Sequence, residues 1–480
     1  MALSFPRVTV LPLDRYATLL SASRMQHVAR RVVELRARLA GRVVWNVSST
    51  AVGGGVAEMV RSLLAYARGA GVDARWVVID GTPEFFRVTK RLHNALHGSP
   101  GDGSPLGESA RHVYDACTAK NAAELEPMVR AGDVAIVHDP QPAGLVPMLL
   151  ARGARVLWRC HVGADYTDAE TERGWRFLAP YLGDAPAYVF SRAAYAPPVL
   201  DAARVHVIPP SIDPFSPKNQ TLGAEVVRAI LAYTGIVAGP VDGPTLFARE
   251  DGTPGRVDRA ADIVRDGPPP PLDAPLVVQV SRWDRLKDPI GVLRGFAELA
   301  GGAAQLVLAG PNVAGVVDDP EGAAVFAETI EAWRALPPLV RARCHLVSLP
   351  TADVGENAAI VNALQRHAAV IVQKSLHEGF GLTVAEAMWK SRPVVASAVG
   401  GIRDQIDDGV QGLLLDDPCD PGAFAAAVAE LLADPLRAQQ MGRAGHDRVL
   451  ERYLGVDSLL RFGAVIESLD AAAELPAAHA

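Results

Sequence analysis

Cysteine is scarce in this sequence of 480 residues, which contains only four. The four are far apart and form no CxxC pair, which argues against a disulfide framework and against a structural zinc site. Reduced thiols in a cytoplasm fit this usage better. The residues are Cys117, Cys160, Cys344 and Cys419.

Long apolar runs are also absent. No stretch approaches the roughly 20 residues that a membrane-spanning helix needs, and Arg7, Asp14 and Arg15 interrupt any apolar core that a secretory signal peptide would require. Positive charge is not in excess, because 47 basic and 54 acidic residues leave a net charge of −7. We therefore expect no nucleic-acid partner, no membrane partner and a cytoplasmic location.

Short apolar, β-branched runs alternate with helical patterns in two successive series. This alternation is typical of parallel sheets covered by helices on both faces. It predicts an α/β protein with two Rossmann-like, doubly wound domains. Strands are expected at 43–47, 76–79, 134–137, 156–158, 188–190 and 205–208, and again at 276–280, 305–309, 345–348, 370–372, 394–396 and 412–415. Helices between them are expected at 56–68, 289–299, 357–366 and 421–433.

Changes in composition set the expected domain boundaries. The first series ends after Pro209-Pro210, and residues 251–255 carry a turn signal that predicts a small hairpin. Four prolines at 268–271 indicate a stiff linker. We expect a first domain over 1–210, a linker with a small insertion over 211–273, a second domain over 274–455, and a tail over 456–480 that frays after about Asp470.

Three glycines, Gly53, Gly54 and Gly55, lie between the first predicted strand and a helix. Glycine lets the backbone approach a ligand closely, and a helix N-terminus offers unpaired N–H groups to an anion. The alternative is a tight turn that needs glycine for packing. The spacing is not the GxGxxG of a dinucleotide site.

His161 lies at the carboxyl end of the fourth predicted strand, and His138-Asp139 end the third. In open α/β sheets this end faces the ligand crevice. A histidine there can bond a sugar hydroxyl. The alternatives are a structural histidine and a simple chain turn.

Arg282 and Lys287 follow the first strand of the second series, five residues apart. Two fixed cations at a strand end suit a diphosphate, whose negative charge grows as it leaves. A solvated surface pair is the alternative.

The strongest motif is EGFGLTVAE, which runs from Glu378 to Glu386. Gly379 and Gly381 form a loop for close approach, and the helix that begins near Leu382 directs its N–H groups toward that loop. A plain helix start explains the glycines but not the flanking acids. A hydrolase pair would bracket one bond without such a phosphate cradle.

Glu378 and Glu386 are separated by seven residues, which resembles the E-x7-E motif of a large family of retaining glycosyltransferases with the type-B fold, two Rossmann-like domains facing across a cleft. The likeness extends over about 42–415 and is most similar to the trehalose glycosyltransferring synthases, with the retaining trehalose phosphorylases as close relatives. The blocks that carry it are WNVSSTAVGGGVAEM, DGTPEFFRVTKRLHNALHG, VHDPQPA, WRCH, IPPSIDPFSPKN, QVSRWDRLKDP, DDPEG and QKSLHEGFGLTVAEAMWKSRPVVASAVGGIRDQI.

The resemblance implies roles for individual residues. It implies His161, Arg282, Lys287 and Glu378 at the reaction centre. It implies donor binding by Gly54, Gly55, Arg282, Lys287, Gly379, Phe380, Gly381, Leu382, Thr383 and Glu386. It implies acceptor binding by Glu84, Arg87, Lys90, Asn94, Asp139 and Gln141.

We therefore expect reversible transfer of glucose from a nucleoside-diphosphate glucose to glucose, giving α,α-trehalose with retention of configuration. A retaining trehalose phosphorylase and a catalytically inactive sugar-nucleotide-binding protein remain as alternatives. No ligand cluster demands a metal, so no cofactor is expected to be required, while Mg²⁺ and a homodimer are left open. The sequence does not decide which base the donor carries.

Overall fold

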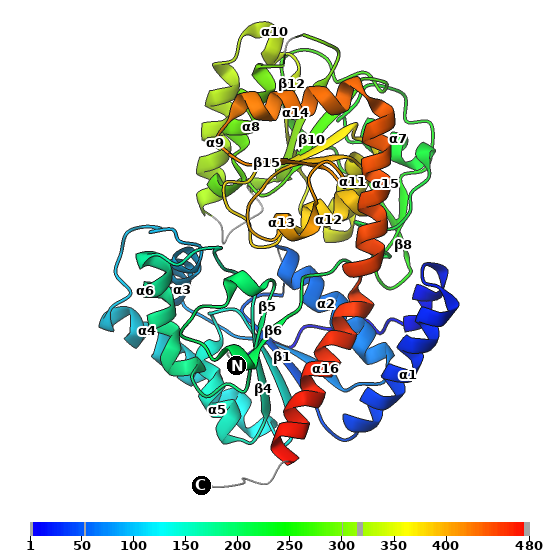
Figure 1. The fold of residues 1–480 in the computed structure, drawn as a ribbon. Coiled ribbons are helices and arrows are strands. Elements are labelled where there is room, and N and C mark those ends of the chain that lie inside the picture. The colour runs from blue at the N-terminus through cyan, green and yellow to red at the C-terminus, as the bar shows by residue number, and fades with distance from the viewer. Residues whose placement is uncertain (1–2, 52–53, 300, 314–319, 475–480) are drawn as a thin grey trace. The chain divides into compact units, whose positions relative to one another are not determined.

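The computed structural model describes residues 3–51, 54–299, 301–313 and 320–474, and the chain forms two compact units. The first unit comprises Met1–Ser211 with Leu454–Ala480, and the second comprises Ile212–Tyr453. In each unit a mainly parallel sheet lies between layers of helices (Figure 1). The predicted α/β class with two Rossmann-like domains is confirmed.

Six parallel strands form the sheet of the first unit, in the order β2-β1-β3-β4-β5-β6. Neighbouring residues along a strand enter opposite apolar layers, since Trp45 packs in one layer and Val44 in the other. All six strands lie at the predicted places. They are β1 Val44–Ser48, β2 Ala74–Val78, β3 Val134–His138, β4 Arg155–Cys160, β5 Ala187–Phe190 and β6 Val205–Val207.

The helices of the first unit cover both faces of this sheet. One layer contains α3, α4, α5 and α6, and the other contains α2 and α16, with α1 packed against α16. The bounds are α1 Ala22–Arg38, α2 Gly54–Gly69, α3 Pro83–Leu96, α4 Glu108–Leu125, α5 Val146–Ala151, α6 Ala169–Leu182 and α16 Gly455–Glu474.

The C-terminal segment differs from the expected tail over 456–480. Its described part is the helix α16, which belongs to the first unit and packs on α2. Phe462 enters the apolar layer under the sheet, and Asp470 accepts bonds of 2.8 and 3.2 Å from the Arg42 guanidinium. The chain is therefore anchored at the point where fraying is expected. The final residues lie outside the described part.

Seven strands form the sheet of the second unit, in the order β15-β14-β13-β10-β11-β12-β9. Six are parallel and lie at the predicted places, and β9 pairs antiparallel with β12. Sequence reasoning missed β9. The strands are β9 Asp262–Val264, β10 Leu276–Val280, β11 Gln305–Pro311, β12 Cys344–Leu349, β13 Val370–Gln373, β14 Val394–Ser397 and β15 Leu413–Leu415.

Helices also cover this second sheet. Residues of α8, α9 and α14 share one apolar layer, while α7 packs on α11 and α12 packs on α15. The bounds are α7 Ala224–Tyr233, α8 Pro289–Ala297, α9 Pro320–Arg334, α10 Pro338–Arg341, α11 Val354–His367, α12 Leu382–Trp389, α13 Ile402–Gln405, α14 Pro421–Ala433 and α15 Pro435–Arg452.

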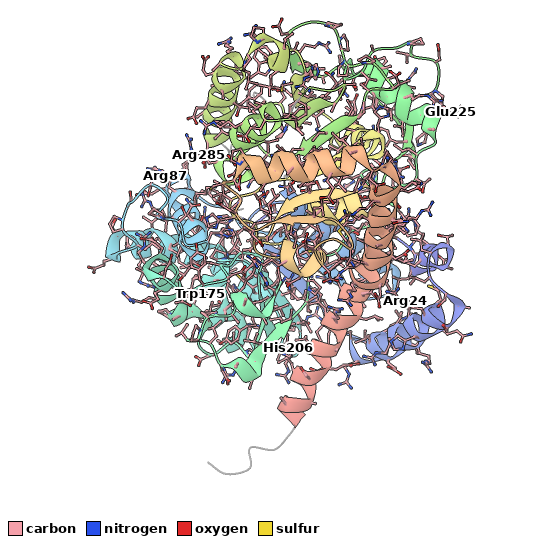
Figure 2. All side chains as sticks on the ribbon, turned by 45° about the horizontal axis from the view of Figure 1, so that its top comes forward. Arg24, Arg87, Trp175, His206, Glu225 and Arg285 are labelled. Carbon is pink, nitrogen blue, oxygen red and sulfur yellow. The ribbon has the colours of Figure 1, made fainter. Side chains whose placement is uncertain are left out.

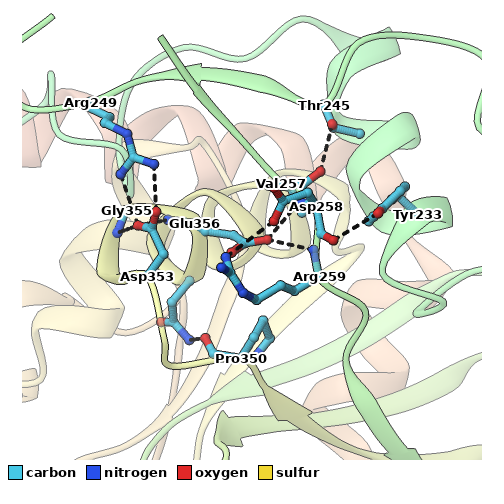
Figure 3. Close-up of polar contacts among 11 residues, drawn as sticks. Tyr233, Thr245, Arg249, Val257, Asp258, Arg259, Pro350, Asp353, Gly355 and Glu356 are labelled. Carbon is cyan, nitrogen blue, oxygen red and sulfur yellow. Dashed lines mark hydrogen bonds and ion pairs between the residues drawn. The ribbon is translucent and has the colours of Figure 1, made fainter. Parts of the chain in front are cut away.

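The insertion forms the predicted hairpin, with β7 Leu246–Ala248 paired to β8 Pro254–Arg256. Side chains at the start of α11 hold the residues that follow the hairpin (Figure 3). Glu356 is fully buried and accepts the backbone N–H groups of Asp258 and Arg259 at 2.7 and 2.8 Å, as well as the Arg259 guanidinium. The insertion is therefore clamped to the helix that supports the second sheet.

Replacing Glu356 with alanine is expected to destabilise the second unit by about 3 kcal/mol, because two backbone N–H groups and a guanidinium lose their buried acceptor. Chemical denaturation of the variant and the parent measures the difference. Glu225→Ala is the matched control, since Glu225 is an exposed glutamate in the first turn of α7 (Figure 2). Equal stability of the two variants would contradict the clamp.

Candidate functional site

The anion-binding candidates of the second unit lie at one edge of its sheet. Arg282 and Lys287 follow β10, and the loop that contains Glu378 follows β13. The strands β10 and β13 are parallel neighbours, so their carboxyl ends meet at the same edge. The sheet thus brings together residues that are about ninety positions apart in the sequence.

Lys287 and Glu378 form an ion pair at this edge. Both side chains are largely shielded from solvent, and the Ser375 hydroxyl lies 3.2 Å from the Glu378 carboxylate. The carboxylate holds the ammonium group in place, which is a preorganised position for charge. Sequence reasoning assigned separate roles to these residues and did not predict the contact.

A buried lysine supports the turn that carries Lys287. Lys374 is 1% exposed and pairs with Asp288, the residue directly after Lys287. Asp288 has φ 48° and caps α8 by accepting the Gly291 N–H at 3.0 Å. A non-glycine residue in this conformation is strained, and the ion pair and the cap stabilise it. Lys374 was missed because lysine is normally exposed.

The glycine loop ends at an uncapped helix. Gly381 has φ 83° and precedes α12, and as the N-cap residue it has no side chain that could cap the first N–H groups of that helix. Gly401 lies so close to the loop that a Cβ would meet the Phe380 Cα at 2.7 Å. The N–H groups at Leu382 and Thr383 therefore offer an anion-binding end. This position is the one predicted for Gly379–Thr383.

Arg282 differs from Lys287 in its surroundings. Its side chain is about half exposed, and one guanidinium nitrogen lies 3.3 Å from Asp284. A half-exposed cation of this kind can turn toward a ligand at the sheet edge. The neighbouring Arg285 bonds Glu328 instead, at 2.6 and 2.7 Å.

Glu386, the second acid of the motif, lies on α12 and is almost fully buried. Lys218 Nζ lies 3.6 Å from its carboxylate. Lys390 Nζ donates to the Glu386 carbonyl and to Asn219 Oδ1, at 3.1 and 2.9 Å. Burial lowers the pKa of Lys390 well below its usual value, while Glu386 acts in the opposite direction. Lys218 and Asn219 belong to the SPKN block, which was the available signal for them.

Three polar side chains of the first unit form a relay across neighbouring strands. Asn46 is on β1, His138 ends β3 and His161 follows β4. His138 Nε2 lies 3.1 Å from Asn46 Oδ1, and His138 Nδ1 lies 3.2 Å from His161 Nε2. The two rings stack with centroids 5.5 Å apart. Asn46 was missed, although a polar residue in an apolar strand was a signal.

The relay fixes which nitrogen of each ring carries hydrogen, given the amide orientation assigned to Asn46. An amide oxygen only accepts, so His138 donates from Nε2 and its Nδ1 accepts from His161 Nε2–H. His161 Nδ1 is then an acceptor. It is buried and has no hydrogen-bond partner among the described residues. Burial, followed by the charge of Arg159, lowers the pKa of His138 to about 3 and that of His161 well below its usual value.

Asp139 holds the backbone of His161. Its φ is 66°, and its carboxylate accepts the His161 N–H at 2.7 Å. Burial raises the pKa of Asp139 to about 7, although that N–H and Arg159 act in the opposite direction. Gln141 Oε1 is also buried without a partner in the described part of the chain. Among the expected acceptor residues, these two lie nearest in sequence to the relay.

The other expected acceptor residues lie on α3. Glu84, Arg87 and Lys90 are exposed along one side of the helix, and Asn94 is half buried (Figure 2 labels Arg87). Hydrogen bonds in the described residues do not join them to His161. The end of α3 reaches the loop after His161 through His97, whose Nδ1 lies 3.1 Å from the Gly163 carbonyl.

The predicted glycine turn after β1 is described only in part. Gly54 has φ 80° and begins α2 with Gly55, as expected for a helix start, while Gly53 lies outside the described residues. Among the described residues, no group of three or more His, Cys, Asp or Glu side chains could hold a metal ion. No helix in the described part is long and apolar enough to cross a bilayer.

Acid is expected to weaken the first unit through the His138 relay. The pKa of His138 is lowered on folding, so its contribution to stability is full above pH 6.5 and is lost as pH falls from there toward 3. The melting temperature should therefore fall between pH 7 and pH 4, and His138→Gln should reduce that fall. Exposed His27→Gln is the control. An unchanged pH profile in His138→Gln would contradict a buried neutral imidazole.

Comparison with known proteins identifies the family. The family model "Trehalose synthase, N-terminal domain" matches residues 46–197, and "Glycosyl transferases group 1" matches residues 354–448. Trehalose synthase of Rubrobacter xylanophilus is 37% identical over 88% of this chain and 89% of its own length. The chain belongs to the trehalose synthase family. It is therefore a glycosyltransferase of trehalose metabolism.

This trehalose synthase family member is also similar to a trehalose phosphorylase in sequence and to a trehalose-phosphate synthase in fold. Trehalose phosphorylase of Grifola frondosa is 26% identical over 80% of this chain but only 51% of its own length. The α,α-trehalose-phosphate synthase (UDP-forming) of Burkholderia xenovorans, solved in complex with glucose-6-phosphate, has a TM-score of 0.64 at 17% identity over 90% of this chain and 100% of that one. Its likeness establishes the predicted type-B fold. The residues Asn46, His138, His161, Glu378 and Glu386 lie within the two matched segments, whereas Arg282 and Lys287 lie outside both.

Proposed function

We propose that this trehalose synthase homologue transfers glucose from a nucleoside-diphosphate glucose to glucose and forms α,α-trehalose with retention of configuration. The observation that carries the proposal is the Lys287–Glu378 pair beside the uncapped start of α12. One edge of the second sheet thus offers positive charge for a diphosphate and a carboxylate for sugar hydroxyls. Membership of the trehalose synthase family supports glucose as the sugar that is transferred.

The cations act on the leaving group. As the bond between the glucose C1 and the diphosphate oxygen breaks, negative charge grows on the diphosphate. Lys287 and the N–H groups of α12 stabilise that charge from fixed positions, and Arg282 turns toward it. These groups supply positive charge without a bound metal, so transfer is expected to continue after treatment with EDTA.

The two glutamates bind different parts of the donor. Glu378 follows β13 and orients glucose hydroxyls while it holds Lys287. Glu386, farther along α12, accepts hydrogen bonds from the ribose, and Lys218 lies beside its carboxylate. Contacts with ribose and phosphate do not distinguish one nucleotide base from another.

The acceptor attacks the same face that the diphosphate leaves. A bond forms between the acceptor oxygen and C1, and the acceptor proton passes to the departing phosphate oxygen, so no protein nucleophile is consumed. His161 Nδ1 accepts a hydrogen bond from a sugar hydroxyl, which satisfies its buried lone pair. The reverse reaction uses the same path, with the diphosphate as the attacking group.

The competing candidate is phosphorolysis of trehalose, favoured by the likeness to trehalose phosphorylase and by an anion site that also suits inorganic phosphate. Purified protein should be given a panel of nucleoside-diphosphate glucoses with glucose, and nucleoside diphosphate release should be measured. Separately, trehalose is incubated with inorganic phosphate. We expect glucose-dependent release from at least one donor. Consumption of trehalose with phosphate, and no release from any donor, would favour the phosphorylase.

A further inference from the structure

A cationic cavity lies at the opposite edge of the second sheet. Asp273 precedes β10, His367 precedes β13 and Arg392 precedes β14. These three parallel strands are neighbours in the order β14-β13-β10, so the residues before them meet at the amino-terminal edge. Lys287 and Glu378 follow β10 and β13, at the carboxyl-terminal edge. One strand length separates the two places.

The cavity has a volume of about 500 Å³. This volume lies in the range of small-molecule sites. Its charged walls come from the amino-terminal edge and from two helices, with Arg228 on α7 and Arg366 in the last turn of α11. Apolar side chains form the remainder, namely Leu222, Ala224, Val227 and Leu272.

Positive charge in this cavity is not balanced. The guanidinium groups of Arg228, Arg366 and Arg392 are accompanied by the single carboxylate of Asp273, and the His367 imidazole lies among them. The Arg366 guanidinium bonds only neutral acceptors, namely Asn362 Oδ1 at 2.9 Å and the carbonyls of Asn219 and Gln220 at 3.1 and 2.9 Å. Arg392 donates to the Ala368 carbonyl at 3.2 Å.

One donor of the cavity wall is unpaired among the described residues. Arg392 Nε is buried and has no hydrogen-bond partner among the described residues. A buried guanidinium without a counter-charge is costly, and an anion that binds beside Arg392 offsets that charge. The cations of the other edge are arranged differently, because Lys287 and Lys374 each face a carboxylate.

The pKa values agree with uncompensated charge. Burial lowers the pKa of Arg366 to about 10, and the nearby Arg392 adds to that effect. Burial also lowers the pKa of Arg392 and of His367, and for His367 the charges of Arg392 and Arg228 contribute. Mutual repulsion among cations is relieved when an anion binds between them.

We propose that this cavity binds a small phosphate-bearing molecule, either inorganic phosphate or a sugar phosphate. Guanidinium groups match phosphate oxygens in geometry and charge. The apolar walls and the volume leave room for a sugar beside the phosphate. The site is separate from donor binding and does not depend on the proposed transfer reaction.

The test uses an Arg282→Ala, Lys287→Ala background, which removes the cations of the donor site. Its melting temperature is measured with inorganic phosphate, glucose 6-phosphate or glucose at millimolar concentration and equal ionic strength. We expect at least one phosphate to raise it by about 2 °C or more, and glucose not to. The phosphate that binds more tightly identifies the source of the anion.

Arg228→Gln and Arg392→Gln, each added to that background, should weaken binding about tenfold, the scale for one charge-assisted bond. Arg228 is exposed, so its loss should leave the fold intact, whereas Arg392 also holds a carbonyl. Arg294→Gln, at an exposed position on α8, is the control and should bind as the background does. No shift with either phosphate, or shifts unchanged by both cavity variants, would overturn the proposal.

Discussion

Replacing Lys287 with alanine is expected to lower kcat about 10²-fold or more, the scale for removing one preorganised charge donor. The ammonium group is fixed by Glu378 and by the turn that the Lys374–Asp288 pair supports. A fixed cation stabilises the leaving diphosphate more than the ground-state donor, so kcat falls rather than KM alone. Arg282→Ala should lower kcat on a similar scale, because its guanidinium acts on the same group.

Steady-state rates with a saturating nucleotide sugar measure this effect. Arg285→Ala is the matched control, since Arg285 lies in the same turn but bonds Glu328 (Figure 2 labels Arg285). The control should keep nearly the parental rate. Circular dichroism and the melting temperature establish that each variant is folded. A Lys287→Ala enzyme with parental kcat would remove Lys287 from the reaction centre.

Glu378→Gln is expected to lower kcat/KM about 10²-fold while changing the affinity for nucleoside diphosphate little. The neutral amide keeps the shape of the side chain but loses the charge that orients sugar hydroxyls and holds Lys287. The nucleoside diphosphate carries no sugar at that position, so its binding reports only the phosphate and ribose contacts.

Titration calorimetry with the nucleoside diphosphate, beside the transfer rate, separates the two effects. Glu386→Gln is the comparison, and it should weaken nucleotide binding more, because Glu386 is assigned to the ribose. If Glu378→Gln loses nucleotide affinity as strongly as it loses transfer, Glu378 belongs to nucleotide binding or to structure.

Periodicity placed the strands well because buried parallel strands are continuous apolar runs, as at 276–280 and 134–137. The candidate anion site was predicted from local chemistry, since the glycines at 379 and 381 and the helix after them are adjacent in sequence. Strand order then brought Lys287 beside Glu378, and a sequence alone does not give that order.

Contacts between distant segments account for what sequence reasoning missed. Lys374 is buried because Asp288 neutralises it, and nothing local distinguishes it from a surface lysine. Asn46 is part of the candidate site only because it bonds His138, which lies on the neighbouring strand β3. The helix α16 forms where a tail was expected, because its apolar side chains pack into the core of the first unit. Propensity is a weak guide where tertiary packing decides.

Identification of the product tests the central claim most directly. Purified protein is incubated with a nucleoside-diphosphate glucose and glucose, and the product is treated with trehalase. The proposed reaction predicts a non-reducing disaccharide in equal amount to the nucleoside diphosphate released, and trehalase should convert each molecule of it to two molecules of glucose. A product that resists trehalase, or one that forms only when glucose 6-phosphate replaces glucose, would contradict it.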